Sequence, residues 1–148
     1  MSEDTILIVT EQSEPVIFNV LSVGPQGPRG EPGGELVSYC AGETLGGHRM
    51  IVLENDLAIY ASCTNVLHGN RVVGMTVGAI MSGAFGDVRR SGMIEEVSWN
   101  WNINLPIWLG ENGLLTQTVP ESGFSLIIGY PVTSTKVMIG IKEPIFLI

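Results

Sequence analysis

The chain has 148 residues, of which 45% are hydrophobic and 15% are charged. Fifteen acidic against seven basic residues give a formal net charge of -8 at pH 7. This composition is too apolar for a disordered chain, and its acidity argues against the basic surface that nucleic acids and anionic membranes require. We therefore expect one globular domain with a short appendage and no nucleic-acid partner.

The sequence predicts neither export nor insertion into a membrane. No apolar run reaches the roughly 18 residues that a membrane-spanning helix needs. The chain starts with the acidic sequence MSED, whereas a secretory signal starts with a positive region ahead of its apolar stretch. We expect a protein that has no signal peptide and works without membrane insertion.

Residues 1–23 contain two short β-prone runs, ILIV at 6–9 and VIFNVL at 16–21, on either side of a polar stretch. Each run has the length of a single strand, and two strands alone are marginally stable in water. The segment is therefore predicted to dock on another protein or a neighbouring subunit; the alternative is that it folds back onto the rest of the chain. The candidate docking residues are Ile6, Ile8, Val16 and Phe18.

The spacer 24–34 has glycine at every third position, at Gly24, Gly27, Gly30 and Gly33. Each of its three complete triplets also holds a proline. This pattern is typical of a collagen triple helix, because only glycine fits at the axis of three wound chains. The alternative is an extended Pro/Gly linker. Three triplets are too few to hold three chains together, so a triple helix here requires that residues 35–148 form a homotrimer.

Residues 35–148 are predicted to form an all-β head domain, a compact antiparallel barrel or sandwich. Short β-prone runs alternate with glycines and turn residues about every ten residues. The expected strands cover residues 50–53, 58–61, 71–77, 99–103, 107–109, 124–128 and 137–141. Predicted turns lie at 55–56, 68–70 and 111–113, and the last contains Asn-Gly, the strongest hairpin signal of the set. Only residues 77–85 suggest a short helix.

The sequence offers no residues to which we assign catalysis. The cysteines, Cys40 and Cys63, are predicted to be reduced and packed, because neither has a CxxC partner or a nearby pair of histidines. His48 and His68 lack an acid and a hydroxyl neighbour in the order of a catalytic triad. We expect no catalytic residue, no metal site and no cofactor. The apolar residues 145–148 are predicted to form a last strand or to lie at an interface.

The sequence WNWNIN at 99–104 alternates apolar residues with asparagines. On a strand, this period of two places Trp99, Trp101 and Ile103 on one face. One interpretation is a glycan site in which the indoles stack on a sugar ring. The alternative is a strand with its tryptophans in the core and its asparagines facing water or a three-fold axis. The candidate ligand-binding residues are Trp99 and Trp101, together with His68 and Arg71 in a second loop.

The layout resembles the small virion fibre proteins of tailed bacteriophages, of the tail-fibre, baseplate, head-fibre and decoration types. These proteins share a short β-prone N-terminal peptide, a brief Gly-X-Y segment and a glycine-rich β domain. The stretches that carry the resemblance are AGETLGGHR at 41–49, IYA at 59–61, VGMTVGA at 73–79, PIWLG at 106–110, GLLT at 113–116, IGYP at 128–131 and EPI at 143–145.

The resemblance implies a homotrimeric, non-enzymatic structural protein of the virion, assembled in the host cytoplasm. Residues 1–23 would attach it to other virion proteins of the tail or baseplate, residues 24–34 would wind the three chains, and residues 35–148 would expose a head. The implied partner of the head is a host-surface glycan or protein. The first alternative is a trimeric capsid decoration or head-fibre protein, and the second is a small glycan-modifying enzyme.

Overall fold

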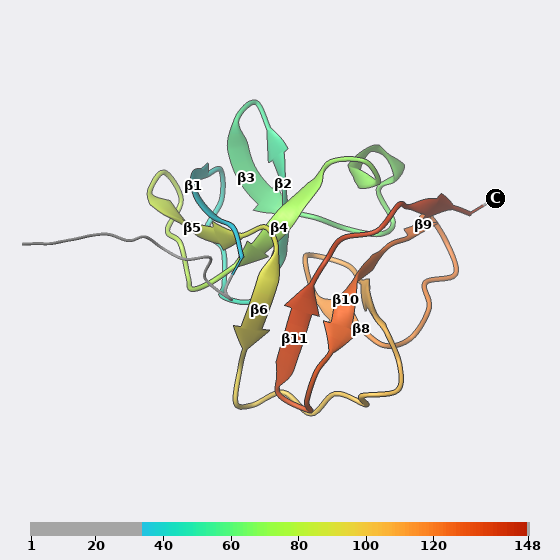
Figure 1. The fold of residues 1–148 in the computed structure, drawn as a ribbon. Helices are drawn as coiled ribbons and strands as arrows, with labels where there is room; N and C mark the ends of the chain where they lie inside the picture. The colour runs from blue at the N-terminus through green and yellow to red at the C-terminus, as the bar shows by residue number, and fades with distance from the viewer. Residues whose placement is uncertain (1–33, 148) are drawn as a thin grey trace, which may run out of the picture. The chain divides into compact units, whose positions relative to one another are not determined.

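The structure, a computed structural model, describes residues 34–147. Within this range the regular elements are β-strands and one 3₁₀ turn, η2 (Val66–His68), so the prediction of an all-β domain is confirmed (Figure 1). No helix among these residues is long and apolar enough to cross a membrane. The predicted docking segment 1–23 and the Gly-X-Y residues 24–33 lie outside the described residues.

The first five strands form a small closed barrel (Figure 1). They are β1 (Leu36–Ala41), β2 (Met50–Glu54), β3 (Leu57–Tyr60), β4 (Val72–Thr76) and β5 (Phe85–Arg89). Their order is β1-β3-β2-β4-β5, and β5 pairs with β1 to close the barrel. Neighbouring strands are antiparallel except β1 and β3, which are parallel, so the prediction of an antiparallel barrel was wrong at this pair. The reason is that β3 folds back on β2 as a hairpin and thereby runs in the direction of β1.

Small and large aliphatic side chains fill the barrel. Ala41 and Ala58 are fully buried beside Leu45 and Ile51, and a Cβ on Gly86 would collide with the side chain of Ile80.

The two-residue turn at 55–56 joins β2 to β3 with φ angles of 54° and 65°, as a type I′ hairpin turn requires. The predicted turn is therefore confirmed.

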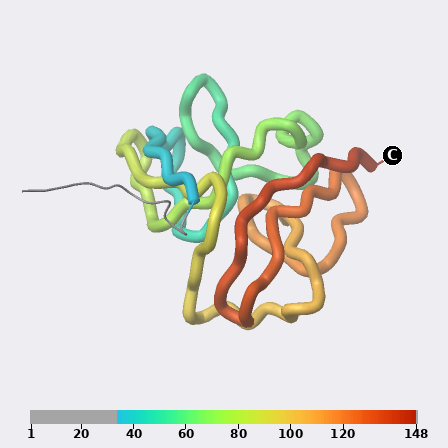
Figure 2. Tube along the Cα trace, in the orientation of Figure 1, coloured from blue at the N-terminus to red at the C-terminus, as the bar shows by residue number. Residues whose placement is uncertain are grey.

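The remaining strands form a second, open sheet in the order β6-β11-β10-β7-β8, with every neighbouring pair antiparallel. They are β6 (Gly92–Glu95), β7 (Ile107–Leu109), β8 (Leu115–Thr116), β10 (Ile127–Pro131) and β11 (Lys136–Ile139). Figure 2 shows β10 and β11 as orange and red segments that run side by side.

A separate two-stranded ribbon pairs β9 (Phe124–Ser125) with β12 (Ile145–Phe146). The predicted last strand is thereby confirmed. Ile145 and Phe146 are 64% and 46% exposed in the single chain, so their burial at an interface stays a prediction. The predicted strand at 124–128 is divided here, because β9 ends at Ser125 and β10 begins at Ile127.

One hydrophobic core joins the barrel to the second sheet. Met50 and Met75 contribute from the barrel, while Ile107, Phe124 and Val137 contribute from the later strands, and all five are fully buried. Burying a side chain of this size stabilises the fold by about 1.5–3 kcal/mol. Because both sheets pack on the same core, the described residues belong to one compact unit.

The β7–β8 hairpin closes at Asn112 and Gly113, as the Asn-Gly signal predicts. The N–H of Met50 donates to the carbonyl of Gly113 at 2.8 Å, and the N–H of Gly113 donates to the carbonyl of Ala61. A Cβ on Gly113 would lie 2.6 Å from the carbonyl oxygen of Met50. The tip of this hairpin is thereby fixed against the barrel.

The predicted strand at 99–103 was wrong. These residues form a loop, in which the N–H of Trp101 donates to the carbonyl of Ser134 at 2.8 Å. The Oδ1 of Asn102 accepts the N–H of Asn104, and asparagine side chains that bond the backbone in this way favour turns over strands. Ile103 is 58% exposed and does not share the partly buried face of the tryptophans.

The suggested helix at 77–85 was also wrong. Leu45 and Ile80 form an isolated antiparallel bridge and exchange two backbone hydrogen bonds of 2.8 Å. The segment therefore pairs with a neighbouring loop, whereas a helix would bond within itself. Gly78 and Gly83 lie in the same segment, and glycine weakens a helix by about 1 kcal/mol relative to alanine.

Candidate functional site

Trp99 and Trp101 lie side by side in the loop between β6 and β7. Their ring centroids are 5.7 Å apart and their planes are tilted by 55°. Both side chains are partly buried against the shared core. The N–H of Trp99 donates to the carbonyl of Glu96 at 3.0 Å, which holds the start of the loop in a tight turn. The two candidate ligand-binding tryptophans are therefore together, on a loop.

A histidine and a glutamate complete the cluster, which we call the aromatic site (His48, Glu96, Trp99 and Trp101). The ring of His48 meets Trp99 edge-on, with centroids 5.3 Å apart and an angle of 73° between the planes. Its Nδ1 lies 3.7 Å from Oε1 of Glu96. The backbone of His48 has a φ of 58°, in the left-handed region, and this turn aims the ring at the loop of the tryptophans.

The carboxylate of Glu96 is held in its charged form. The hydroxyl of Ser98 donates to Oε2 at 2.6 Å and the N–H of Ser98 donates to the same oxygen at 3.1 Å. These two hydrogen bonds lower the pKa of Glu96, and the neighbouring His48 lowers it further. The aromatic site thus combines indole rings with a fixed acceptor, an arrangement that suits the ring face and hydroxyls of a sugar.

His68 lies in the loop after β3, and its contacts stay within that loop. Its Nδ1 accepts the N–H of Ser62 at 3.1 Å, and its Nε2 lies 3.2 Å from Nδ2 of Asn65. The residue is only 8% exposed, and this burial lowers its pKa, with a smaller contribution from the Arg71 guanidinium. The side chain therefore stabilises its own loop as a neutral ring. Within the described residues, no contact of His68 joins it to the aromatic site.

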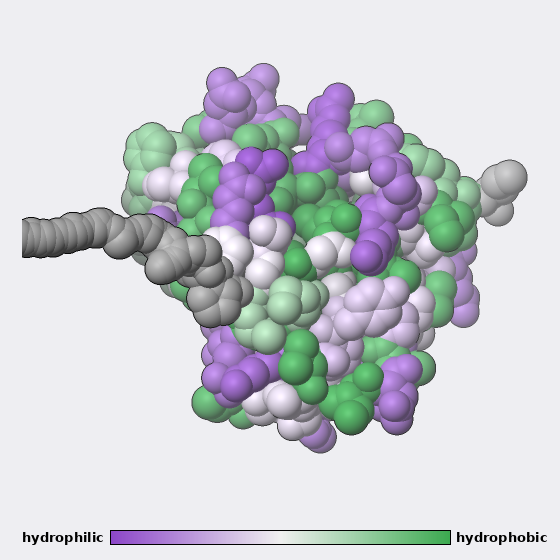
Figure 3. Space-filling view, viewed as in Figure 1, coloured by the Kyte–Doolittle hydropathy of each residue, from purple (hydrophilic) through white to green (hydrophobic). Residues whose placement is uncertain are grey.

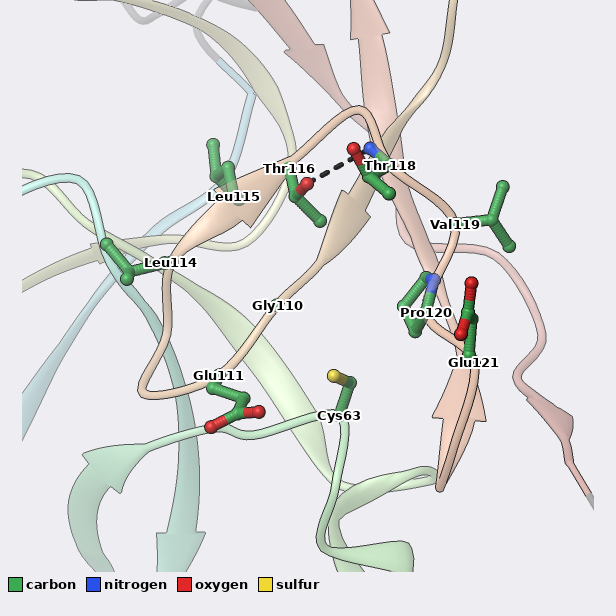
Figure 4. A pocket seen from close by; sticks show the side chains of 10 residues that line it. All are labelled: Cys63, Gly110, Glu111, Leu114, Leu115, Thr116, Thr118, Val119, Pro120 and Glu121. Atoms are coloured by element: carbon green, nitrogen blue, oxygen red, sulfur yellow. Dashed lines mark hydrogen bonds between the residues drawn. The ribbon is translucent and has the colours of Figure 1, made fainter.

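A pocket of about 450 Å³ opens beside the β7–β8 hairpin (Figure 4). The hairpin forms one wall and the loop at 118–121 forms the other. In Figure 4 the thiol of Cys63 lies between the side chains of Glu111 and Pro120. Leu114 and Val119, which are 51% and 50% exposed, add apolar surface to its walls. We call this hollow the Cys63 pocket.

The chemistry of the Cys63 pocket favours binding over covalent catalysis. Burial raises the pKa of the Cys63 thiol, and the carboxylate of Glu111 raises it further. A thiol kept protonated in this way is a poor nucleophile. Cys40 and Cys63 are both free of disulfides, so the prediction of reduced cysteines is confirmed, although Cys40 is only partly buried.

Two parts of the site were not predicted from the sequence: the contacts of His48 and Glu96, and the Cys63 pocket. The alternation at 99–104 drew attention to the tryptophans. The fold brings His48 to them from the loop between β1 and β2, and Glu96 from the end of β6. Ser98, two residues after Glu96, gave a weak signal, because serine favours turns with local side-chain hydrogen bonds. The Cys63 pocket had no comparable signal, since the fold brings Cys63 to the distant stretch 110–121.

Among residues 34–147, no group of three His, Cys, Asp or Glu side chains is placed to hold a metal ion. The candidate residues for trimerisation and docking, at 24–33 and 6–18, lie outside the described part of the chain. The chain matches no protein-family model, no curated protein and no solved structure.

Proposed function

We propose that this protein is a short trimeric fibre of a bacteriophage virion, with a structural rather than an enzymatic role. Residues 1–23 attach it to the tail or baseplate, the Gly-X-Y residues wind three chains together, and the β domain is the exposed head. The observation that carries the proposal is the strict glycine period, which holds from Gly24 to Gly33 and ends three residues before β1 begins.

The form of the head supports this proposal. Three triplets do not hold a triple helix alone, so the head itself must contribute to association. It exposes two neighbouring apolar side chains on the second sheet: Tyr130 is 47% exposed, and Met138, directly opposite it on the next strand, is 42% exposed. Exposed apolar residues in groups mark surfaces that meet another protein.

The aromatic site supports contact between the head and a host-surface glycan. Two partly buried indoles lie in the same short loop as Glu96, whose carboxylate is held by Ser98, so aromatic rings and a charged acceptor occur together. A single site of this size binds weakly. Three copies on one fibre raise the effective concentration, so weak contacts combine into firm attachment.

The test of the trimer is the solution mass of the full-length chain by light scattering. We expect three times the chain mass of 15.9 kDa. The double variant Gly27→Ala, Gly30→Ala should melt at a lower temperature than the wild type, because each methyl group crowds the axis of the triple helix. The matched control is Gln26→Ala, which changes a position that tolerates side chains. A monomeric wild type would contradict the proposal.

The test of the virion role is to label purified particles with an antibody against the head and to image them. Label at the tail tip or baseplate supports the fibre proposed here. Label over the capsid would move the protein to the decoration or head-fibre class while keeping the trimer. Particles that lack the protein altogether, by mass spectrometry of the purified virion, would overturn the proposal.

A further inference from the structure

Three apolar side chains form a continuous row across the outer face of the second sheet. Strand register places Met93 on β6 opposite Met138 on β11, and Met138 opposite Tyr130 on β10. Met138 and Tyr130 are 42% and 47% exposed, and Met93 is partly exposed. The next residues along the strands, Ile94 and Val137, point to the opposite face, into the shared core. We call the three residues the methionine row.

Charged groups border the methionine row on one side. The next outward-facing pair along β6 and β11 is Glu95 opposite Lys136, and both are exposed. Lys142 also places its Nζ 5.9 Å from the ring centroid of Tyr130, at the end of the row. Figure 3 looks onto this side of the molecule and shows a pale green area over β6 and β11, with a purple area at its lower left and white, pale purple and dark green areas on its other sides. An apolar centre with a charged rim is the usual anatomy of a protein interface.

The methionine row lies beside the point where the described chain starts. The N–H of Glu35 donates to Oγ of Ser91 at 3.2 Å, and the N–H of Arg90 donates to the carbonyl of Glu35 at 2.9 Å. Gly34 has a φ of 74° and packs so closely on Ser91 that a Cβ would collide with its carbonyl oxygen. The residue after the Gly-X-Y segment is therefore fixed at the start of β6, next to Met93.

This position limits where the other two copies lie. In a triple helix all three chains run close to one axis, and the three residues from Gly34 to Leu36 span at most about 10 Å. The surface around the start of β6 must therefore lie near the three-fold axis. Phe85 lies further from the start of the described chain. It pairs with Cys40, which is four residues and about 13 Å along β1 from Leu36.

We propose that the methionine row is the contact by which the heads of three copies of this chain pack around the three-fold axis. The inference rests on the proposed trimeric fibre and assigns its association surface to the outer face of β6, β11 and β10. Methionine and tyrosine suit this role, since flexible thioethers adapt to a partner and a tyrosine ring contributes a large contact area. Association would cover the apolar centre and leave Glu95 and Lys136 at the rim.

The central experiment compares two substitutions in the full-length protein. Met138→Asp places three buried carboxylates near the axis, so we expect the light-scattering mass to fall from a trimer to a monomer at micromolar concentration. Phe85→Asp makes the same chemical change at a more exposed apolar position and should leave the trimer intact. Circular dichroism of both variants reports whether the β fold is retained.

A second measurement does not depend on disruption of the trimer. A cysteine is introduced at Met138 or at Phe85 with Cys40 replaced by serine, and its labelling by a maleimide is timed by mass spectrometry. We expect Met138→Cys to be labelled at least tenfold more slowly than Phe85→Cys in the native protein, and equally fast in denaturant. This result would support the interface even if Met138→Asp failed to fold.

The outcomes separate the interface from the fibre itself. A wild-type chain that is monomeric overturns the proposed fibre, and the interface with it. A wild-type trimer that survives Met138→Asp, with position 138 labelled as fast as position 85, overturns the interface alone. In that case the trimer stands and its contacts lie elsewhere on the head.

Discussion

The barrel and the second sheet contain similar numbers of residues, but the barrel is closed whereas the second sheet has two free edges. In the barrel every strand has two neighbours, and the β2–β3 connection is a two-residue turn. The second sheet is open, with β6 and β8 as its edges, and long loops at 96–106 and 117–123 connect its strands. The aromatic site and the Cys63 pocket both draw on these loops.

This difference indicates where binding residues can be placed without disturbing the fold. A closed barrel leaves no backbone edge and little freedom for insertions, so its sequence is constrained by packing. Loops over a fixed scaffold can vary without loss of the fold, and binding residues concentrate there for that reason. The loops of both regions contribute to the candidate contacts: His48 and Cys63 lie in loops of the barrel, while the other residues of the two sites come from the later part of the chain.

The largest expected effect tests whether the two regions fold as one unit. Phe124→Ala removes a fully buried ring from the shared core and should lower the free energy of unfolding by about 3–5 kcal/mol. Val88→Ala removes two methyl groups from the barrel core and should cost about 2 kcal/mol. Urea unfolding followed by tryptophan fluorescence and by circular dichroism should give coincident transitions for both variants. Separate transitions would mean that barrel and sheet unfold independently.

A smaller effect tests the contact between the β7–β8 hairpin and the barrel. Gly113→Ala should lower the free energy of unfolding by about 1–3 kcal/mol, because the residue has a φ of 74° and its Cβ would press on the carbonyl of Met50. Gly140→Ala is the matched control, since a Cβ there would meet no atom within 4 Å. Its expected change is below about 0.5 kcal/mol. Equal destabilisation of the two variants would contradict this reading of the hairpin.

The smallest effect is a pH dependence that originates in the loop of His68. Burial holds the pKa of His68 below its ordinary value of 6.5, so below pH 6.5 the unfolded chain binds a proton that the folded chain does not. Its contribution to stability is therefore complete above pH 6.5 and is lost as the pH falls from there through the folded pKa. Urea titrations should show that the free energy of unfolding decreases less between pH 7.5 and pH 5.5 in His68→Gln than in the wild type. His48→Gln serves as the control, and a loss unchanged in His68→Gln would argue against this assignment.

The elements that could be predicted from the sequence are those whose signals are local. The run at 107–109 is apolar, with a β-branched isoleucine and an aromatic tryptophan, and the Asn-Gly turn after it favours a hairpin without help from the rest of the fold. By contrast β5 contains Gly86, Asp87 and Arg89, residues that are poor or neutral in strands. It is a strand because the closing barrel supplies partners on both sides.

The candidate site was predictable only in part, for a related reason. The two tryptophans stand out in any reading of the sequence, but the period-two pattern around them suggested a strand. A hydrogen bond from the N–H of Asn104 to Oδ1 of Asn102, and one from the N–H of Trp101 to the carbonyl of Ser134, hold a loop there instead. His48 contacts Trp99 from a distant segment of the chain, and a local sequence pattern does not predict a contact of this kind.

The position of β1 within the barrel has a mechanical consequence. β1 pairs with β5 over five successive residue pairs and with β3 on its other side, immediately after the chain leaves Gly34. A pull applied through the N-terminal segment acts along β1, and the hydrogen bonds of an antiparallel pair lie perpendicular to that direction. The load is therefore shared by the whole row of bonds in shear, whereas a terminal hairpin would unzip one bond at a time. A domain held through β1 in this way resists unfolding by a pull along that strand.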